Sequence, residues 1–122
     1  MNVLVTGGLG YIGSHLSILL AEAGCNVLIV DNLSNSQFEI FSKIQYISKK
    51  EVNFSKLDIR DTNSLSQFLS KNKIDSVIHC AGLKSVGESV KNPIKYYDNN
   101  INGTISLINA MNENNIKKLI FS

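Results

Sequence analysis

The stretch Thr6-Gly7-Gly8-Leu9-Gly10-Tyr11-Ile12-Gly13 follows the apolar run 3–5 and precedes a segment with helical periodicity. Its glycines satisfy both the GxGxxG and the GxxGxxG spacing. A glycine can adopt a positive φ in a tight turn, and it lets a phosphate approach the backbone amides because no Cβ intervenes. A helix that begins near Tyr11 would offer unpaired N–H groups and a positive dipole end to a pyrophosphate. The stretch therefore predicts a dinucleotide-binding strand–turn–helix unit, and the alternative is a tight turn without a ligand.

Apolar runs alternate with amphipathic segments along the rest of the chain. The expected strands cover residues 3–5, 27–30, 54–57, 76–81 and 118–121. Expected helices cover 11–23 and 38–47, and Asp61 or Thr62 can cap a third with Leu65, Phe68 and Leu69 facing inward. A long fourth helix begins at Pro93 and carries Tyr97, Ile101, Ile105, Ile108 and Met111 on one face.

This alternation predicts an α/β fold of the Rossmann-like, doubly wound kind. Right-handed crossovers would join the strands into a parallel sheet with helices on both faces. Numbered along the chain, the strands are expected in the order 3-2-1-4-5. A ligand crevice would lie above the carboxyl ends of the first and fourth strands, where the order reverses.

The composition limits the chain to one domain and excludes several classes of partner. Twelve basic and ten acidic residues leave a formal charge of +2 without a basic stripe, which disfavours nucleic acid as a partner. No apolar run approaches the roughly 18 residues of a membrane span, and the N-terminus does not resemble a signal peptide. Cys25 and Cys80 lie far apart without CxxC or paired histidines, which excludes a disulfide framework or zinc site. We therefore expect no membrane partner and a cytoplasmic location.

Acidic residues follow the second and third expected strands. Asp31 stands 18 positions after Gly13, where a carboxylate can accept hydrogen bonds from both ribose hydroxyls of an adenosine. Alternatively, Asp31 is an exposed turn residue that caps the next segment. The polar turn 32–36 would add donors and acceptors beside that ribose. Asp58-Ile59 would lie at the edge of an adenine ring, or Asp58 would cap the following helix; the sequence favours neither.

Small residues follow the fourth expected strand. Ala81 and Gly82 would let the backbone lie against a flat cofactor, and Lys84 would reach the phosphates of cofactor or substrate. The alternative for Lys84 is a solvated surface position. For His79 and Cys80 core packing is favoured, because the sequence shows neither a second metal ligand nor a neighbour that would lower the thiol pKa.

Five segments carry a resemblance to a known family. They are TGGLGYIGSH (6–15), VDNLSNS (30–36), LDIRD (57–61), VIHCAGLKSVGESVKNP (77–93) and YYDNNINGT (96–104). Together they resemble the N-terminal part of the UDP-glucose (UDP-galactose) 4-epimerases, in the extended short-chain dehydrogenase/reductase superfamily, over essentially the whole chain. The glycine motif marks only the superfamily. The segment GLKSVGES (82–89) is more specific, because related nucleotide-sugar dehydratases and uronate epimerases carry other residues there.

The resemblance implies a tightly held NAD that takes a hydride from C4 of UDP-glucose or UDP-galactose and returns it to the opposite face. With the glycines, it places cofactor contacts at Gly7, Gly10, Tyr11, Ile12, Gly13, Asp31, Asn32, Leu33, Ser34, Asn35, Ser36, Asp58, Ile59, Cys80, Ala81, Gly82, Leu83, Lys84 and Asn99. Lys84 is also the expected substrate contact. Cys80 departs from the aromatic residue expected there. The resemblance further implies a homodimer for the complete protein.

In this family the general base is a Tyr, helped by a Lys and a Ser. Within the chain only Tyr46 and Lys50 have the YxxxK spacing, and they lie between the second and third strands, away from the expected crevice. We therefore expect no catalytic residue and no metal site within residues 1–122. We also expect these residues to form an incomplete NAD-binding domain that stops before the later strands and the substrate domain. The alternatives are another nucleotide-sugar epimerase or dehydratase of the superfamily, or a non-catalytic dinucleotide-binding module.

The acidic residue after the second strand leads to a prediction about cofactor choice. In the complete protein, Asp31 should favour NAD over NADP, because a 2′-phosphate beside a carboxylate meets like-charge repulsion in a partly desolvated crevice. Asp31→Ala should narrow this preference, measured as the ratio of the two dissociation constants. Equal affinity of the unmutated protein for both cofactors would contradict the assignment.

Overall fold

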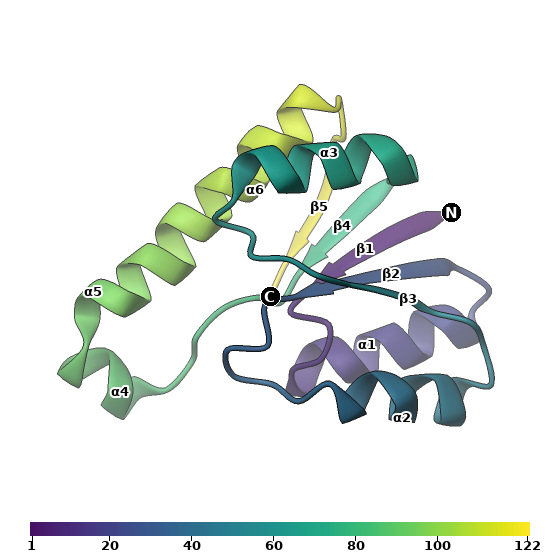
Figure 1. Ribbon diagram of the computed structural model, residues 1–122, viewed down its shortest axis with the longest axis horizontal. Helices are drawn as coiled ribbons and strands as arrows, with labels where there is room; N and C mark the ends of the chain where they lie inside the picture. The colour runs from purple at the N-terminus through teal and green to yellow at the C-terminus, as the bar shows by residue number, and fades with distance from the viewer.

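Five parallel strands form a single sheet in the computed structural model, which describes all residues 1–122 (Figure 1). They are β1 (Asn2–Thr6), β2 (Asn26–Asp31), β3 (Asn53–Lys56), β4 (Ser76–His79) and β5 (Lys118–Phe121). Their order across the sheet is β3-β2-β1-β4-β5, so the predicted topology is confirmed. β4 ends two residues before the predicted boundary, because the chain turns at Cys80, whose carbonyl accepts a 2.8 Å hydrogen bond from Gly82 N.

Helices cover both faces of the sheet. They are α1 (Tyr11–Glu22), α2 (Glu39–Ser48), α3 (Thr62–Asn72), α4 (Val86–Lys91), α5 (Pro93–Tyr96), the π-helix η1 (Tyr97–Asn102) and α6 (Gly103–Glu113). Figure 1 shows α1 and α2 on one face, α3 and α6 on the other, and α4 standing away from the sheet. Asp61 is the N-cap of α3, where its side chain accepts a hydrogen bond from Ser64 N, as the sequence predicts. No helix is long and apolar enough to cross a membrane.

The strands supply two hydrophobic clusters, one under each helical layer. Neighbouring strand residues point to opposite faces, so Leu4 packs with the α3–α6 layer and Val5 with the α1–α2 layer. The larger cluster includes Leu65 and Leu69 of α3, both nearly inaccessible, with Phe68 packed against it. Both faces of the central strands are therefore buried, as expected for a parallel sheet with helices on each side.

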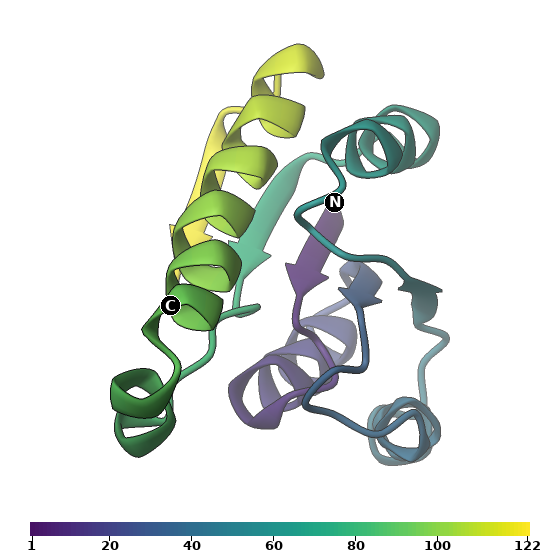
Figure 2. The same cartoon turned by 60° about the vertical axis from the view of Figure 1, so that its left-hand side comes forward.

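The segment after Pro93 differs from the single helix that the periodicity predicts. Figure 2 shows α5, η1 and α6 running on as one column, but the middle turn has π geometry. Of the predicted apolar face only Met111 is buried; the other four side chains are 48–59% exposed: Tyr97, Ile101, Ile105 and Ile108. The prediction of one uninterrupted α-helix is therefore wrong at this turn, and four of the five residues predicted to share a face are exposed.

Small residues decide which side of this helix meets the protein. Gly103 lies so close to Ile59 that an added Cβ would stand 2.9 Å from its Cδ1. Ser106 pairs with Thr62 through a 2.7 Å hydroxyl–hydroxyl hydrogen bond, and Ala110 is fully buried. The side of α6 with these small residues therefore meets the protein, and Ile105 and Ile108 face outward.

His79 lies in the core, as predicted, within a directed chain of hydrogen bonds. The Thr104 hydroxyl donates to the Asn100 carbonyl at 2.6 Å, so it accepts from His79 Nε2 at 2.9 Å. His79 Nδ1 then accepts from the Thr6 hydroxyl at 2.7 Å, which assigns the neutral Nε2–H tautomer. Burial, with a smaller effect of the Lys84 charge, lowers the His79 pKa to about 4. Burial also raises the pKa of the Cys80 thiol, which supports packing and not nucleophilic chemistry.

The contact between the start of α1 and the glycine turn generates a stability prediction. A Cβ on Gly13 would lie 2.3 Å from the carbonyl oxygen of Gly7, which is backbone and cannot swing away. Gly13→Ala should therefore lower the free energy of unfolding by about 1–3 kcal/mol, measured by urea denaturation. The control is Gly87→Ala in α4, where an added Cβ meets nothing within 4 Å and should stabilise by up to about 1 kcal/mol. Equal effects of the two substitutions would contradict the packing argument.

The buried imidazole predicts a loss of stability in acid. The pKa of His79 is about 4 in the folded chain against 6.5 for the unperturbed group, so the unfolded state binds the proton first as the pH falls. The free energy of unfolding should drop between pH 6.5 and pH 4, by up to about 3 kcal/mol from this group. Urea denaturation across this range measures it. His79→Gln should remove this part of the pH dependence, whereas His15→Gln, at an exposed position, should retain it.

Candidate functional site

A cavity that is open to solvent lies at the carboxyl ends of the central strands. Its walls come from the glycine turn, the turn after β2, the segment after β3, the segment after β4, and η1. The lining residues are Gly7, Gly10, Val30, Asp31, Asn32, Ser34, Asn35, Ser36, Leu57, Ile59, Cys80, Ala81, Gly82, Leu83 and Asn99. The crevice therefore stands where the strand order reverses, as the topology predicts.

The glycine turn brings three pieces of backbone together at one end of the cavity. Gly7 has φ +65, and an added Cβ there would lie 2.7 Å from the Cα of Ala81. Gly10 precedes α1 without a side-chain cap, and the N–H groups of Tyr11, Ile12 and Gly13 have no hydrogen-bond partner. A cluster of free amides at a helix N-terminus is suited to an anion such as a pyrophosphate.

The side chains of the next three predicted contacts do not line the cavity. Tyr11 is 81% exposed and its ring meets the edge of His15, and Ile12 is 49% exposed. Gly13 is buried against the turn and serves the close packing of α1 on the end of β1. At these positions the backbone amides are unpaired and follow directly after the lining residue Gly10.

Asp31 is buried and holds two turns at once. Its Oδ2 accepts a hydrogen bond from Leu9 N at 3.1 Å, inside the glycine turn. Its Oδ1 accepts from Leu33 N at 2.9 Å and from the Ser36 hydroxyl at 2.8 Å. The exposed-turn alternative is therefore wrong about exposure, although the carboxylate does fix the following turn. Leu33, also predicted as a contact, adopts φ +62 and lies outside the lining.

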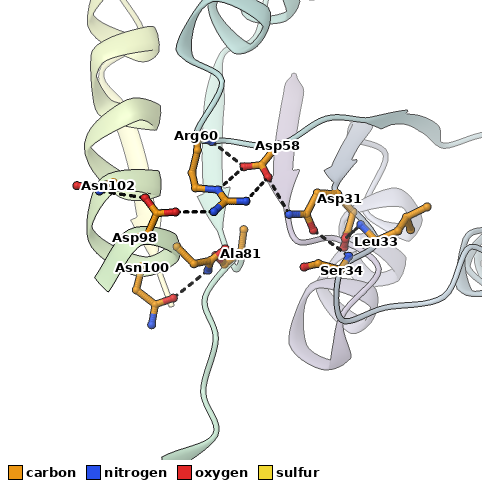
Figure 3. Close-up of polar contacts among 11 residues, drawn as sticks. Asp31, Leu33, Ser34, Asp58, Arg60, Ala81, Asp98, Asn100 and Asn102 are labelled. Atoms are coloured by element: carbon orange, nitrogen blue, oxygen red, sulfur yellow. Dashed lines mark hydrogen bonds and ion pairs between the residues drawn. The ribbon is translucent and has the colours of Figure 1, made fainter. Parts of the chain in front are cut away.

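Asp58 lies behind the cavity wall and does not line it. Its Oδ1 accepts hydrogen bonds from Arg60 N at 2.9 Å and Nε at 3.0 Å, and its Oδ2 accepts from Arg60 Nη2 at 2.7 Å and Asn32 Nδ2 at 3.1 Å (Figure 3). These bonds, chiefly those from Arg60, hold the Asp58 pKa well below its usual range. Helix capping, one of the two roles considered for Asp58, falls instead to Asp61. The adjacent Ile59 does line the cavity.

The segment after β4 is held by two asparagines of η1. The Asn100 amide accepts from Leu83 N at 2.8 Å and donates to Leu83 O at 2.9 Å, as a neighbouring strand would. Asn99 donates to Ala81 O at 3.2 Å. The sequence does not predict the contacts of Asn100 and Arg60. The repeated Asn in YYDNNINGT was the available signal, but periodicity does not reveal a π turn that turns both side chains toward one loop.

Lys84 belongs to a second, smaller hollow beside the first. Its Nζ donates to Ser122 O at 3.1 Å and lies 5.8 Å from the centre of the Phe121 ring. This hollow is lined by His79, Gly82, Lys84, Asn100, Thr104, Phe121 and Ser122. Lys84 is exposed, as the surface alternative predicts, but its ammonium is held at the end of β5 and it does not line the larger cavity.

The residues around the larger cavity are suited to binding. A carboxylate with hydroxyl and amide side chains lines it at the end of β2, and apolar Leu57 and Ile59 can flank a flat ring. The unpaired amides at the start of α1 follow directly after the lining residue Gly10. Small residues at 81 and 82 leave room along the floor. None of the four tyrosines lines this cavity, and no group of three or more His, Cys, Asp or Glu side chains could hold a metal ion.

Comparisons with known proteins give a consistent result. The chain is 52% identical over 122 residues to UDP-glucose 4-epimerase from Yersinia enterocolitica and 52% identical over 121 residues to that from Dictyostelium discoideum. The two matches include 100% and 99% of this chain, but only 36% and 35% of the length of the two enzymes. A crystal structure of UDP-glucose 4-epimerase from Bifidobacterium longum in complex with NAD⁺ and UDP superposes with a TM-score of 0.97 at 45% identity. That match covers all of this chain and 36% of the other.

Family membership follows from the extent of the match. Residues 3–122, nearly the whole chain, match the NAD dependent epimerase/dehydratase family. The match begins in β1 and takes in every wall of the cavity described above. The chain therefore belongs to the NAD dependent epimerase/dehydratase family.

Proposed function

We propose that this chain is the N-terminal, NAD-binding portion of a UDP-hexose 4-epimerase that interconverts UDP-glucose and UDP-galactose. The observation that carries the proposal is the cavity where the strand order reverses. Its lining offers the glycine turn for phosphates, Asp31 for a ribose and Ile59 for a flat ring, which are the parts of a dinucleotide. The relatives support it, because they are UDP-glucose 4-epimerases and one was crystallised with NAD⁺ and UDP. Since the chain spans 35–36% of the length of the two enzyme relatives, the activity is assigned to the longer protein.

Each wall of the cavity would hold a different part of NAD. The free amides at the start of α1 would bind the pyrophosphate, and Asp31 would accept from the adenosine ribose while keeping its bonds to the turns. Ile59 would lie against the adenine ring, and the segment 80–83 with Asn99 would lie along the rest of the cofactor. Lys84 is proposed to meet the nicotinamide ribose or a substrate phosphate from the adjacent hollow.

The residues of this chain would bind and orient, and would not move the sugar proton. When bound, NAD supplies a reversible hydride acceptor for C4 of the hexose. Removal of the C4 hydroxyl proton needs a base within hydrogen-bond reach of that oxygen. The one YxxxK pair, Tyr46 and Lys50, stands at the end of α2 with the Tyr46 ring 84% exposed, so the base is assigned to residues outside 1–122.

Two further properties are proposed for the complete protein. The first is a homodimer, supported by the exposed apolar side of η1 and α6 at Ile101, Ile105 and Ile108. The second is a cytoplasmic location, supported by Cys25 and Cys80, which are both free thiols.

The experiment compares residues 1–122 with the frame-extended form. Both are purified and assayed for UDP-galactose turnover and for bound NAD released by denaturation. We expect turnover and stoichiometric NAD in the extended form, and no turnover with weak NAD binding in the short one. Tyr46→Phe in the extended form is the control and should keep full activity.

Three outcomes would count against the proposal. Turnover by the short form near the rate of the long one would place the base inside residues 1–122. Bound NAD without any turnover of a UDP-hexose by the extended form would favour a non-catalytic dinucleotide-binding module. Turnover of a different nucleotide sugar alone would favour another enzyme of the family.

A further inference from the structure

A line of hydrogen-bonded side chains, of which only Asn32 lines the cavity, joins two of its walls. Arg60 Nη1 donates to Asp98 Oδ2 at 2.6 Å, and Arg60 Nε and Nη2 donate to Asp58 at 3.0 and 2.7 Å. Asn32 donates to Asp58 Oδ2 at 3.1 Å and accepts from Ser34 N at 3.0 Å. Figure 3 shows Arg60 between the two carboxylates. We call Asp98, Arg60, Asp58 and Asn32 the Arg60 relay.

The planar guanidinium is what allows one side chain to join both carboxylates. Its Nε–Nη2 edge pairs with Asp58 and leaves Nη1 for Asp98, an arrangement that the single ammonium of a lysine cannot reproduce. Asp58 in turn accepts four hydrogen bonds, two on each oxygen, which is about the full capacity of a carboxylate. Its position is therefore determined by Arg60 and Asn32 together. Arg60 also holds Asp58 ionised, because it lowers the pKa of that carboxyl.

Each part of the relay adjoins a residue that lines the cavity. Asn32 is itself a lining residue, Ile59 lies between Asp58 and Arg60, and Asn99 follows Asp98 on η1. Arg60, Asp58 and Asp98 are not among the residues that line the cavity. Single exposed ion pairs contribute little to stability, but a network that spans 38 positions of sequence can fix the separation of the segments it joins.

We propose that Arg60 is a positioning residue that fixes the separation between the β2 turn and η1, and thereby slows the release of the adenosine end of a bound dinucleotide. The inference rests on the proposed NAD site. Without the guanidinium, Asp58 loses two of its four hydrogen bonds and keeps those from the backbone N of Arg60 and from Asn32. Asn32 then has a less firmly held partner, so the wall beside the adenosine loosens. The same loss removes the Arg60–Asp98 link between η1 and the segment after β3.

The test measures NAD release and nucleotide affinity in the frame-extended form. The variants are Arg60→Met, which keeps most of the stem, Arg60→Lys, Asp98→Asn, and the double variant Arg60→Met/Asp98→Asn. The dissociation rate comes from chasing radiolabelled NAD with excess unlabelled NAD, and the affinities of AMP and nicotinamide mononucleotide from calorimetry. Lys95→Met is the matched control, because it removes an ion pair of similar exposure, with Glu88, away from the cavity.

We expect Arg60→Met to release NAD about three- to tenfold faster and to bind AMP with an affinity lower by a similar factor. Its affinity for nicotinamide mononucleotide should be unchanged. Arg60→Lys should recover part of the loss. The double variant should release NAD no faster than Arg60→Met, because both links pass through Arg60. Lys95→Met should match the unmutated protein.

Several results would overturn the inference. It would be overturned by an unchanged rate of NAD release in Arg60→Met, or by equal losses of affinity for AMP and for nicotinamide mononucleotide. Additive effects of the two substitutions on the release rate in the double variant would also overturn it. If Arg60→Met fails to fold, Asp98→Asn decides, since it leaves the Asp58 pairing in place, and unchanged release there also overturns it. Failure of the proposed function is distinct, because the unmutated protein would then bind no NAD.

Discussion

The close approach of three backbone segments at the glycine turn is the constraint on which the rest of the structure depends. Gly7 lies against the backbone of Ala81, and Gly13 lies against the carbonyl of Gly7, in both cases closer than a Cβ would permit. These contacts set α1 tightly on the end of β1 and bring the segment after β4 to the same edge. The cavity exists where it does because these segments meet there, and the first amides of α1 stay unpaired because Gly10, which lines the cavity, contributes no capping side chain.

Polar side chains then hold the walls that the glycine turn brings together. Asp31 joins the glycine turn to the turn after β2, and Asn100 holds Leu83 through both of its backbone groups. No buried side-chain nitrogen or oxygen is without a hydrogen-bond partner. Walls fixed in this way need little reordering when a ligand binds, which reduces the entropic cost of association.

The cavity is built from groups that bind and orient a ligand. It offers a carboxylate, hydroxyl and amide side chains and apolar surface, while the titratable core residue His79 is neutral and hydrogen-bonded to two threonine hydroxyls. The match to NAD dependent epimerases and dehydratases is consistent with a domain that holds a cofactor in a defined position.

The sequence by itself determined the strand order, the position of the crevice and the Asp61 cap, because these follow from local patterns: apolar runs, glycine spacing and capping residues. It also identified most of the lining, since residues at the carboxyl ends of parallel strands must meet at one edge. Only the tertiary structure decided which side of η1 and α6 is covered, and that Arg60 joins Asp58 to Asp98. Periodicity shows which residues share a helix face but not which face another element covers, and a contact across 38 positions leaves no local trace in the sequence.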